Sequence, residues 1–129
     1  MEEIENVKSL VRRYQDAIHS QQRDEFYRLW AKGSECTLIS ITNQYKGIET
    51  IYNDFLIGRI QQSYESIDLI DDHIDIQMIN DQFAIVIFEY HTECIKRDTK
   101  ESYGIQGLET QIIVKEDNEW KLLHVHYSK

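Results

Sequence analysis

The stretch Leu108-Glu-Thr-Gln-Ile-Ile-Val-Lys-Glu-Asp-Asn-Glu-Trp-Lys-Leu-Leu-His-Val-His-Tyr-Ser128 decides the fold of this chain. It has β-branched and aromatic residues on both sides of Asp117-Asn118, which predicts two antiparallel strands joined by a tight turn. With the turn on these two residues, the facing pairs on one side of the hairpin are Lys115–Trp120, Ile113–Leu122, Gln111–His124 and Glu109–His126. This register predicts a mixed face that carries a carboxylate, an amide and two imidazoles.

The opposite face of the predicted hairpin is almost wholly apolar. It comprises Leu108, Thr110, Ile112, Val114, Leu123, Val125 and Tyr127. Side chains alternate along a strand, so a change of one residue in the register would separate these two sets. The assignment of the faces therefore depends on the turn.

Upstream of the hairpin, the apolar spacing predicts helices first. The first twenty residues repeat apolar positions every three or four residues, at Ile4, Val7, Leu10, Val11, Tyr14, Ala17 and Ile18. A second helix is predicted over Arg23–Lys32, ending at Gly33, and a third from Gly47 to about Ser63. Three helices therefore precede most of the strands.

The remaining segments have the two-residue period of strands. Strands are predicted over Cys36–Ile41, from Ser66 onward, and over Gln82–Arg97, Ser102–Lys115 and Glu119–Ser128. The turns between the later strands are short, which requires antiparallel neighbours, and Gly104 and Gly107 indicate a bulge or bend. The pattern predicts an α+β fold in a single domain, residues 1–129.

Charge and composition exclude several classes of partner. Fourteen basic and twenty-three acidic residues give a formal charge of −9, which disfavours nucleic acid and anionic membrane. The start Met-Glu-Glu-Ile lacks the features of a secretory signal, so a cytoplasmic location is expected. Cys36 and Cys94 are predicted to be buried free thiols.

Several motifs resemble a known family. Glu109-Thr110 and Trp120 through His124-Val-His126 resemble the end of SnoaL-like proteins and of the calcium/calmodulin-dependent kinase II association domain, within the nuclear transport factor 2-like superfamily. Ala17-Ile18-His19, Tyr45-Lys-Gly47 and Tyr90-His-Thr92 extend the similarity over nearly the whole chain.

The resemblance implies a cone-shaped fold, with three N-terminal helices packed on a strongly bent antiparallel sheet around a pocket. It also implies a dimer, or a larger ring in the kinase relatives. Where the kinase domains place arginines in that pocket, this sequence has Tyr90 and Gln111.

If the mixed face of the hairpin is concave, its polar groups lie among aromatic side chains from the helices and the neighbouring strand. A few polar groups in an apolar wall are typical of a small-molecule site. The predicted ligand-binding residues are Tyr14, Trp30, Tyr52, Tyr90, Thr92 and Gln111.

Glu109, His124 and His126 are the candidate catalytic residues. A carboxylate half buried among aromatic rings would have a raised pKa and could exchange protons with either histidine. Two alternatives remain open: a structural hydrogen bond between Glu109 and a histidine, and a metal held by Glu109 and the two imidazoles. The acidic run Asp68, Asp71, Asp72 and Asp75 lacks an EF-hand pattern and is predicted to be a solvated strand end. No metal and no cofactor are predicted.

Three functions therefore remain open. The first is binding of a small organic ligand without turnover. The second is an acid-base enzyme, namely an isomerase, cyclase, dehydratase or hydrolase acting on a small, mostly apolar substrate. The third is an assembly domain. Because the helices occupy the concave side, the apolar outer face of the sheet is expected to join two copies as a homodimer.

Overall fold

The computed structural model describes residues 2–129, and its helices precede most of its strands, as predicted. The helical segments are α1 (Glu2–Ser20), α2 (Arg23–Arg28), α3 (Ile48–Thr50) and η1 (Ile51–Gln61). The strands are β1 (Thr37–Ile39), β2 (Gln44–Lys46), β3 (Tyr64–Met78), β4 (Phe83–Lys96), β5 (Ser102–Tyr103), β6 (Gln106–Glu116) and β7 (Glu119–Ser128).

The strands form one strongly curled sheet in the order β2-β1-β7-β6-β4-β3, with β5 paired to the end of β4. Sequential strands are antiparallel, as their short turns predicted, but β1 runs parallel to β7. The sheet is therefore mixed, and the prediction of a purely antiparallel sheet is wrong for this pair. A strand can join the sheet beside a strand far along the chain, and the short-turn rule does not cover such long connections.

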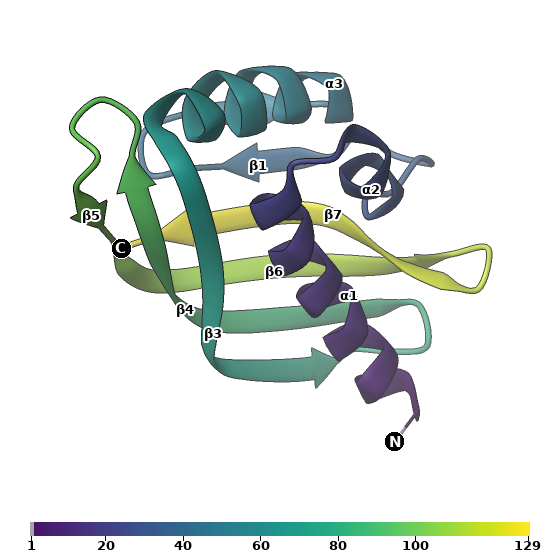
Figure 1. Ribbon diagram of the computed structural model, residues 1–129. Helices are drawn as coiled ribbons and strands as arrows, with labels where there is room; N and C mark the ends of the chain where they lie inside the picture. Colours follow the sequence, from purple (N-terminus) through teal and green to yellow (C-terminus); the bar gives the residue numbers. More distant parts are fainter. Residues whose placement is uncertain (1) are drawn as a thin grey trace.

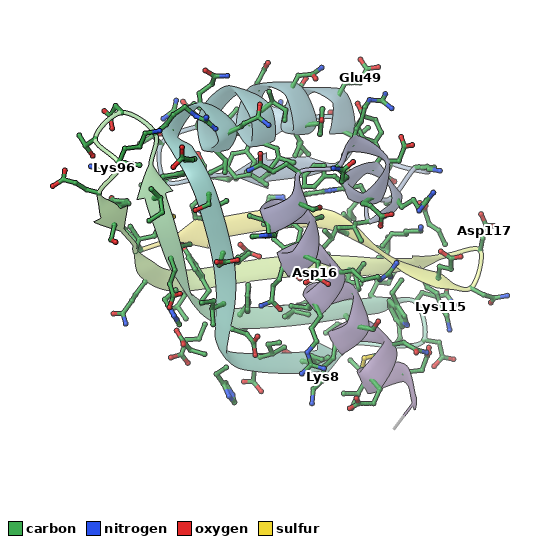
Figure 2. All side chains as sticks on the ribbon, viewed as in Figure 1. Lys8, Asp16, Glu49, Lys96, Lys115 and Asp117 are labelled. Atoms are coloured by element: carbon green, nitrogen blue, oxygen red, sulfur yellow. The ribbon has the colours of Figure 1, made fainter. Side chains whose placement is uncertain are left out.

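Helix α1 lies across the concave side of the sheet (Figure 1). The helix that begins as α3 continues as η1, which packs against β2 and the start of β3. The apolar stripe of α1 explains this position, because Val7, Leu10, Val11 and Tyr14 are buried against the sheet while Arg12 and Arg13 remain exposed. Across the molecule, charged side chains point outward from the ribbon (Figure 2). The side chains of the sheet that face α1 include Ala84, Val86, Phe88, Ile113, Leu122 and Val125, all fully buried.

The second helix is shorter than predicted. It ends at Arg28, because the next residues pair with β7: the Ala31 amide donates to the Leu122 carbonyl (2.8 Å), and the Leu122 amide donates to the Leu29 carbonyl (2.7 Å). Phe26, Leu29 and Trp30 are buried as predicted. Gly33 has a different role, since its amide donates to the Glu116 carboxylate (2.8 Å).

The third helical segment extends from Ile48 close to the predicted end at Ser63, but most of it has i→i+5 hydrogen bonds. This wider helix places Ile51, Phe55 and Leu56 on the buried side at intervals of four or five residues. The predicted irregularity near Gly104 is confirmed, because the strand breaks between β5 and β6. At Gly107 the backbone of Ser128 approaches so closely that the Cβ of any other residue would collide with the Ser128 carbonyl oxygen.

Candidate functional site

A cavity of about 160 Å³ opens between the helices and the concave side of the sheet. It lies at the end of the molecule where β5, the start of β3 and the C-terminus gather, on the left of Figure 1. Most of its wall is aliphatic or aromatic. The lining residues that carry polar groups include Tyr14, Tyr64, Tyr90, Thr92, Glu109 and Tyr127.

Glu109 of β6 is the one acidic side chain in this wall, among the residues that the structure describes. Only 3% of its surface is exposed, and the Gln111 amide donates to its Oε2 at 2.6 Å. Burial raises the pKa of Glu109 to about 7, and the hydrogen bond from Gln111 offsets only part of that effect. The cavity wall therefore contains a carboxyl that changes protonation near neutral pH.

Three tyrosines surround Glu109 from different elements. Tyr14 comes from α1, Tyr90 from β4 and Tyr127 from β7. Burial and then the nearby Glu109 charge raise the pKa of Tyr14 and Tyr90, while the pKa of Tyr127 is raised by burial and then by Tyr90 and Glu109. All three phenols stay protonated at neutral pH and remain hydrogen-bond donors.

Tyr90 and Thr92, two of the predicted ligand contacts, line the cavity and also hydrogen-bond to other parts of the protein. The Tyr90 hydroxyl donates to the Ser128 carbonyl at 3.0 Å, and Thr92 Oγ1 accepts from the Ile105 amide at 3.0 Å. Both interactions connect β4 to segments that close the same end of the cavity. The structure thus brings together Tyr14, Tyr90, Thr92 and Glu109, while their ligand-binding or catalytic roles stay predictions.

His124 and His126 lie on the other side of the sheet, so the prediction that they share a face with Glu109 is wrong. The hairpin register is as expected from Glu116–Glu119 to Ile113–Leu122, but Leu123 is then bulged out of the pairing. Beyond this bulge Gln111 faces Val125 and Glu109 faces Tyr127, while the histidines face Ile112 and Thr110. A single extra residue therefore exchanges the two faces of the final strand.

The histidines contact the outer side of β1 instead of the cavity. His124 Nδ1 forms a hydrogen bond with Thr37 Oγ1, and the rings of His124 and His126 meet edge to face with centroids 6.4 Å apart. Burial, followed by the neighbouring His126, lowers the pKa of His124. Because Glu109 and the two histidines lie on opposite sides of the sheet, they can form neither the structural hydrogen bond nor the shared metal site that the sequence left open.

Trp30, Tyr52 and Gln111 do not line the cavity. Trp30 is buried against Tyr14 and Phe26, and Tyr52 packs against Phe26. Gln111 is fully buried and supports Glu109 from behind the wall. The helical spacing of Trp30 and Tyr52 correctly indicated that both pack in the core, but it could not show whether their rings point into the cavity.

Tyr127 is the principal cavity residue that the sequence assigned to the wrong side. It was expected on the apolar outer face, and the Leu123 bulge turns it inward toward Glu109. Tyr64, Tyr103 and Lys129 also line the cavity and carried no recognisable signal, because they come from strand ends where periodicity is uninformative.

No group of three metal-ligating side chains is found among residues 2–129. The acidic run of β3 is instead engaged in separate contacts. Asp68 lies 2.8 Å from His19, and Asp72 lies 2.8 Å from His91. These acidic side chains are directed to different neighbours and do not converge on one point.

Comparison with known proteins places this chain in a family. The pattern of the calcium/calmodulin dependent protein kinase II association domain matches residues 3–129. The chain belongs to this family. A comparison with curated proteins finds no match.

Solved structures confirm the nuclear transport factor 2-like fold of this association domain. A nuclear transport factor 2-like superfamily protein from Salmonella enterica has a TM-score of 0.90 at 21% identity, covering 96% of this chain and 88% of that chain. The hexachlorocyclohexane dehydrochlorinase LinA-type3 from Novosphingobium barchaimii has a TM-score of 0.86 at 12% identity, covering 98% and 85%.

An uncharacterised protein with a cystatin-like fold from Caulobacter vibrioides gives the same result. Its TM-score is 0.82 at 12% identity, covering 99% of this chain and 89% of that chain. At these identities the likeness establishes the fold alone. No helix of the association domain, over residues 2–129, has the length and apolar character needed to cross a bilayer.

Proposed function

We propose that this association domain binds a small, mostly apolar organic molecule, with a polar group of that molecule held at Glu109. The observation that carries the proposal is a carboxyl only 3% exposed in the wall of a largely apolar cavity. Burying a carboxyl without a cation is unfavourable, and such groups are retained more often for a site than for stability.

The size of the cavity limits the ligand. An engineered apolar cavity of about 150 Å³ accepts benzene. The cavity here, at about 160 Å³, therefore suits one six-membered ring or a branched chain of similar bulk. The aromatic lining residues Tyr14, Tyr90 and Tyr127 suit the flat face or edge of such a ring.

The hydrogen bond from Gln111 decides which oxygen of Glu109 serves the ligand. Because Oε2 accepts the Gln111 N–H, the proton of the neutral carboxyl is placed on Oε1. Oε1 can then donate to a carbonyl or hydroxyl oxygen of the ligand, and after losing the proton it can accept from a ligand hydroxyl.

Acid-base catalysis is the second candidate, and the observation that favours it is the pKa of about 7 for Glu109. A group that gains and loses a proton near working pH can serve an isomerase, cyclase, dehydratase or hydrolase. Fold neighbours such as the dehydrochlorinase named above carry enzyme names. With the histidines outside the cavity, Glu109 would act with the phenols of Tyr14 and Tyr127 as its proton-carrying neighbours, because the Tyr90 hydroxyl donates to the Ser128 carbonyl.

A homodimer through the outer face is the third element of the proposal. We define the outer face as Phe83, Ile85, Ile87, Leu108, Thr110, Ile112, His124 and His126, from strands β4, β6 and β7. Phe83, Ile87 and Leu108 are each more than 40% exposed, which favours a cover of similar apolar character. A second copy of the chain provides such a cover.

A cytoplasmic location is part of the proposal as well. It is supported by the two buried free thiols of Cys36 and Cys94, which suit a reducing compartment.

The dimer is tested by light scattering on Ile87→Lys, with Asn53→Lys as the matched control. Asn53 is exposed on η1, outside the strands that form the outer face. We expect a mass of two chains for the protein and the control, and 15.4 kDa for Ile87→Lys. A wild-type mass of one chain at micromolar concentration contradicts the dimer.

Ligand binding is tested first by native mass spectrometry of the purified protein, followed by denaturation to release any retained molecule. Titration calorimetry with benzyl alcohol then compares the protein with Ile105→Trp, which fills the cavity mouth, and with Ile95→Trp as control. Ile105 lines the cavity, whereas Ile95 alternates with Cys94 and faces away from it. Binding that survives Ile105→Trp, or no saturable binding at millimolar benzyl alcohol and no retained molecule, refutes the proposal.

A further inference from the structure

Side chains on the outer side of the sheet are ordered by charge from one edge to the other. The strand pairings align one row across six strands, from β3 to β2, namely Asp75, Ile87, Thr110, His126, Ile39 and Gln44. Paired residues share a side of the sheet, so all six side chains point away from the helices. The row therefore has a carboxylate at the β3 edge, apolar surface at its centre and an imidazole beyond that centre.

The neighbouring rows have the same order. One contains Gln77, Ile85, Ile112, His124, Thr37 and Lys46, and the other contains His73, Glu89, Leu108 and Ser128. The outer side of the sheet thus has an acidic margin, which we define as Asp75 and Glu89, and a basic margin, which we define as His124, His126 and Lys46. Aliphatic side chains separate the two margins.

Asp75 and His126 are both exposed and have no ion-pair partner within their own chain. Among the side chains that the structure describes, no carboxylate oxygen lies within 4.0 Å of the His126 ring nitrogens, and no cationic nitrogen lies within 4.0 Å of the Asp75 carboxylate. Three strand spacings, or roughly 14 Å, separate the two residues, so they cannot pair with each other. Both are available to a second copy of the chain.

The order of the charges distinguishes two ways of joining two copies face to face. A two-fold axis perpendicular to the strands places each margin on the same margin of the other copy, so that carboxylates meet carboxylates. An axis parallel to the strands, between β4 and β6, exchanges β3 with β7 and β4 with β6. Each row then lies on its own reverse, with His126 opposite Asp75 and Ile87 opposite Thr110. Like charges directly opposite each other are unfavourable, so the charges favour the parallel axis.

We propose that two copies of this chain join through the outer face with the two-fold axis along the strands, and that a contact between protonated His126 of one copy and Asp75 of the other, formed twice, tightens the dimer as pH falls toward 6. This inference rests on the proposed homodimer and adds its orientation and its regulation by pH. The axis passes between β4 and β6, where Ile85, Ile87 and Ile112 provide the apolar centre of the interface.

Within its own chain, His126 has uncharged or basic neighbours. Thr110 of β6 and Ile39 of β1 lie beside it in the row. The His124 ring meets it edge to face, and Lys46 of β2 lies in the next row. Burial, followed by the nearby His126, lowers the pKa of His124, so His124 stays neutral when His126 takes up a proton. None of these neighbours is a carboxylate.

In the dimer, the other copy brings two carboxylates to His126. Asp75 lies directly opposite, and Glu89 lies one row along, where His73 faces it within the same copy. Imidazole changes its charge between about pH 5 and about pH 8, a range in which ordinary carboxylates stay ionised. Because the dimer favours the charged imidazole, dimerisation takes up protons, and the dissociation constant falls as pH falls.

Sedimentation equilibrium measures the dissociation constant of the dimer from about pH 6 to about pH 8, the range in which histidine titrates. The variants are His126→Gln, Asp75→Asn and the control Asp54→Asn, which removes the same charge from an exposed position on η1. We expect the wild-type constant to fall about three- to thirtyfold toward pH 6, because each dimer contains two partly screened ion pairs. The fall should persist in Asp54→Asn and nearly vanish in His126→Gln and Asp75→Asn. All variants keep Glu109, so a pH dependence caused by that carboxyl would survive each substitution.

A charge-exchange experiment tests which residues face each other. His126→Glu places two carboxylates at each contact, and Asp75→Lys places a cation opposite the imidazole, so each variant alone should dimerise more weakly than the wild type. Mixed in equal amounts, the two variants should form a dimer with one chain of each kind, because the new carboxylate then faces the new ammonium. Native mass spectrometry resolves this mixed dimer. Asp54→Lys is the matched control for Asp75→Lys and should form no favoured mixed dimer with His126→Glu.

Two results would overturn the inference in distinguishable ways. If the protein is a dimer but its dissociation constant is independent of pH, or if His126→Glu and Asp75→Lys form no mixed dimer, the contact between these residues is wrong while the outer-face dimer stands. If the protein has the mass of one chain throughout this pH range, the proposed homodimer fails and the inference fails with it.

Discussion

Replacing Glu109 by glutamine should stabilise the protein at neutral and alkaline pH, and the effect should disappear in acid. Glutamine has the shape of the protonated carboxyl and keeps an oxygen that can accept from Gln111. It removes the need to bury a charge in a site that is only 3% exposed. The change therefore isolates the ionisation of one side chain with little change in packing.

The sign and size follow from the pKa of Glu109, which rises from 4.5 to about 7 on folding. Between these values the folded protein holds a proton that the unfolded chain has released, so the free energy of unfolding falls as pH rises through this interval. A shift from 4.5 to about 7 corresponds to ~3 kcal/mol at 1.36 kcal/mol per unit, fully lost above the folded pKa. Glu109→Gln has no ionisable group at this position, so its free energy of unfolding should not fall in this way.

The assay is denaturant unfolding of the protein and Glu109→Gln at a series of pH values from about 4 to about 8, a range that spans the ordinary and the raised pKa of the carboxyl. Glu49→Gln is the matched control, because Glu49 lies on the outer side of α3 with its side chain in solvent (Figure 2). The two stability curves should meet in acid and separate toward alkaline pH. A difference independent of pH, or a variant less stable in alkali, would refute the reasoning.

Three further predictions concern other parts of the molecule. Gly107→Ala should destabilise the protein by about 1–3 kcal/mol in denaturant unfolding, because its Cβ would collide with the Ser128 carbonyl oxygen; unchanged stability would contradict that crowding. Glu116→Ala should speed amide hydrogen exchange at Lys32 and Gly33, which donate to this carboxylate at 2.9 and 2.8 Å, whereas Glu119→Ala should not. Cys36 and Cys94 should react slowly with iodoacetamide until the protein unfolds, because both thiols are buried and burial raises the pKa of Cys36 to about 11; rapid reaction of the folded protein would count against this.

The spacing of apolar residues was sufficient to predict the helix and the long strands that have one side buried in the core. The stripe Val7, Leu10, Val11 and Tyr14 identified α1, and the alternation of β4, β6 and β7 identified long strands. The resemblance supplied the curl of the sheet and the place of the cavity. The expected burial of Glu109 and the raised pKa that follows from it are confirmed, while its role in binding or catalysis stays a prediction.

The failures share one cause, which is that local pattern carries no information on an irregularity or a distant partner. Nothing in Leu122-Leu123-His124 distinguishes a bulged leucine from a paired one, yet the bulge decides which side chains enter the cavity. The second helix was predicted too long because Leu29–Ala31 find partners in β7, about ninety residues later. The parallel pairing of β1 with β7 is a contact of the same long-range kind.

That long-range pairing sets the order in which the molecule can be completed during synthesis. Strand β1 has only β2 and β7 as sheet neighbours among the described residues, and the segment after α2 is held by the same final hairpin. The segment from Trp30 to β1 must therefore wait for the last strand before its apolar residues Trp30 and Leu38 are covered, because these two residues pair with Leu122 and Val125 of β7. Until β7 has left the ribosome, these side chains form the surface that a chaperone would recognise.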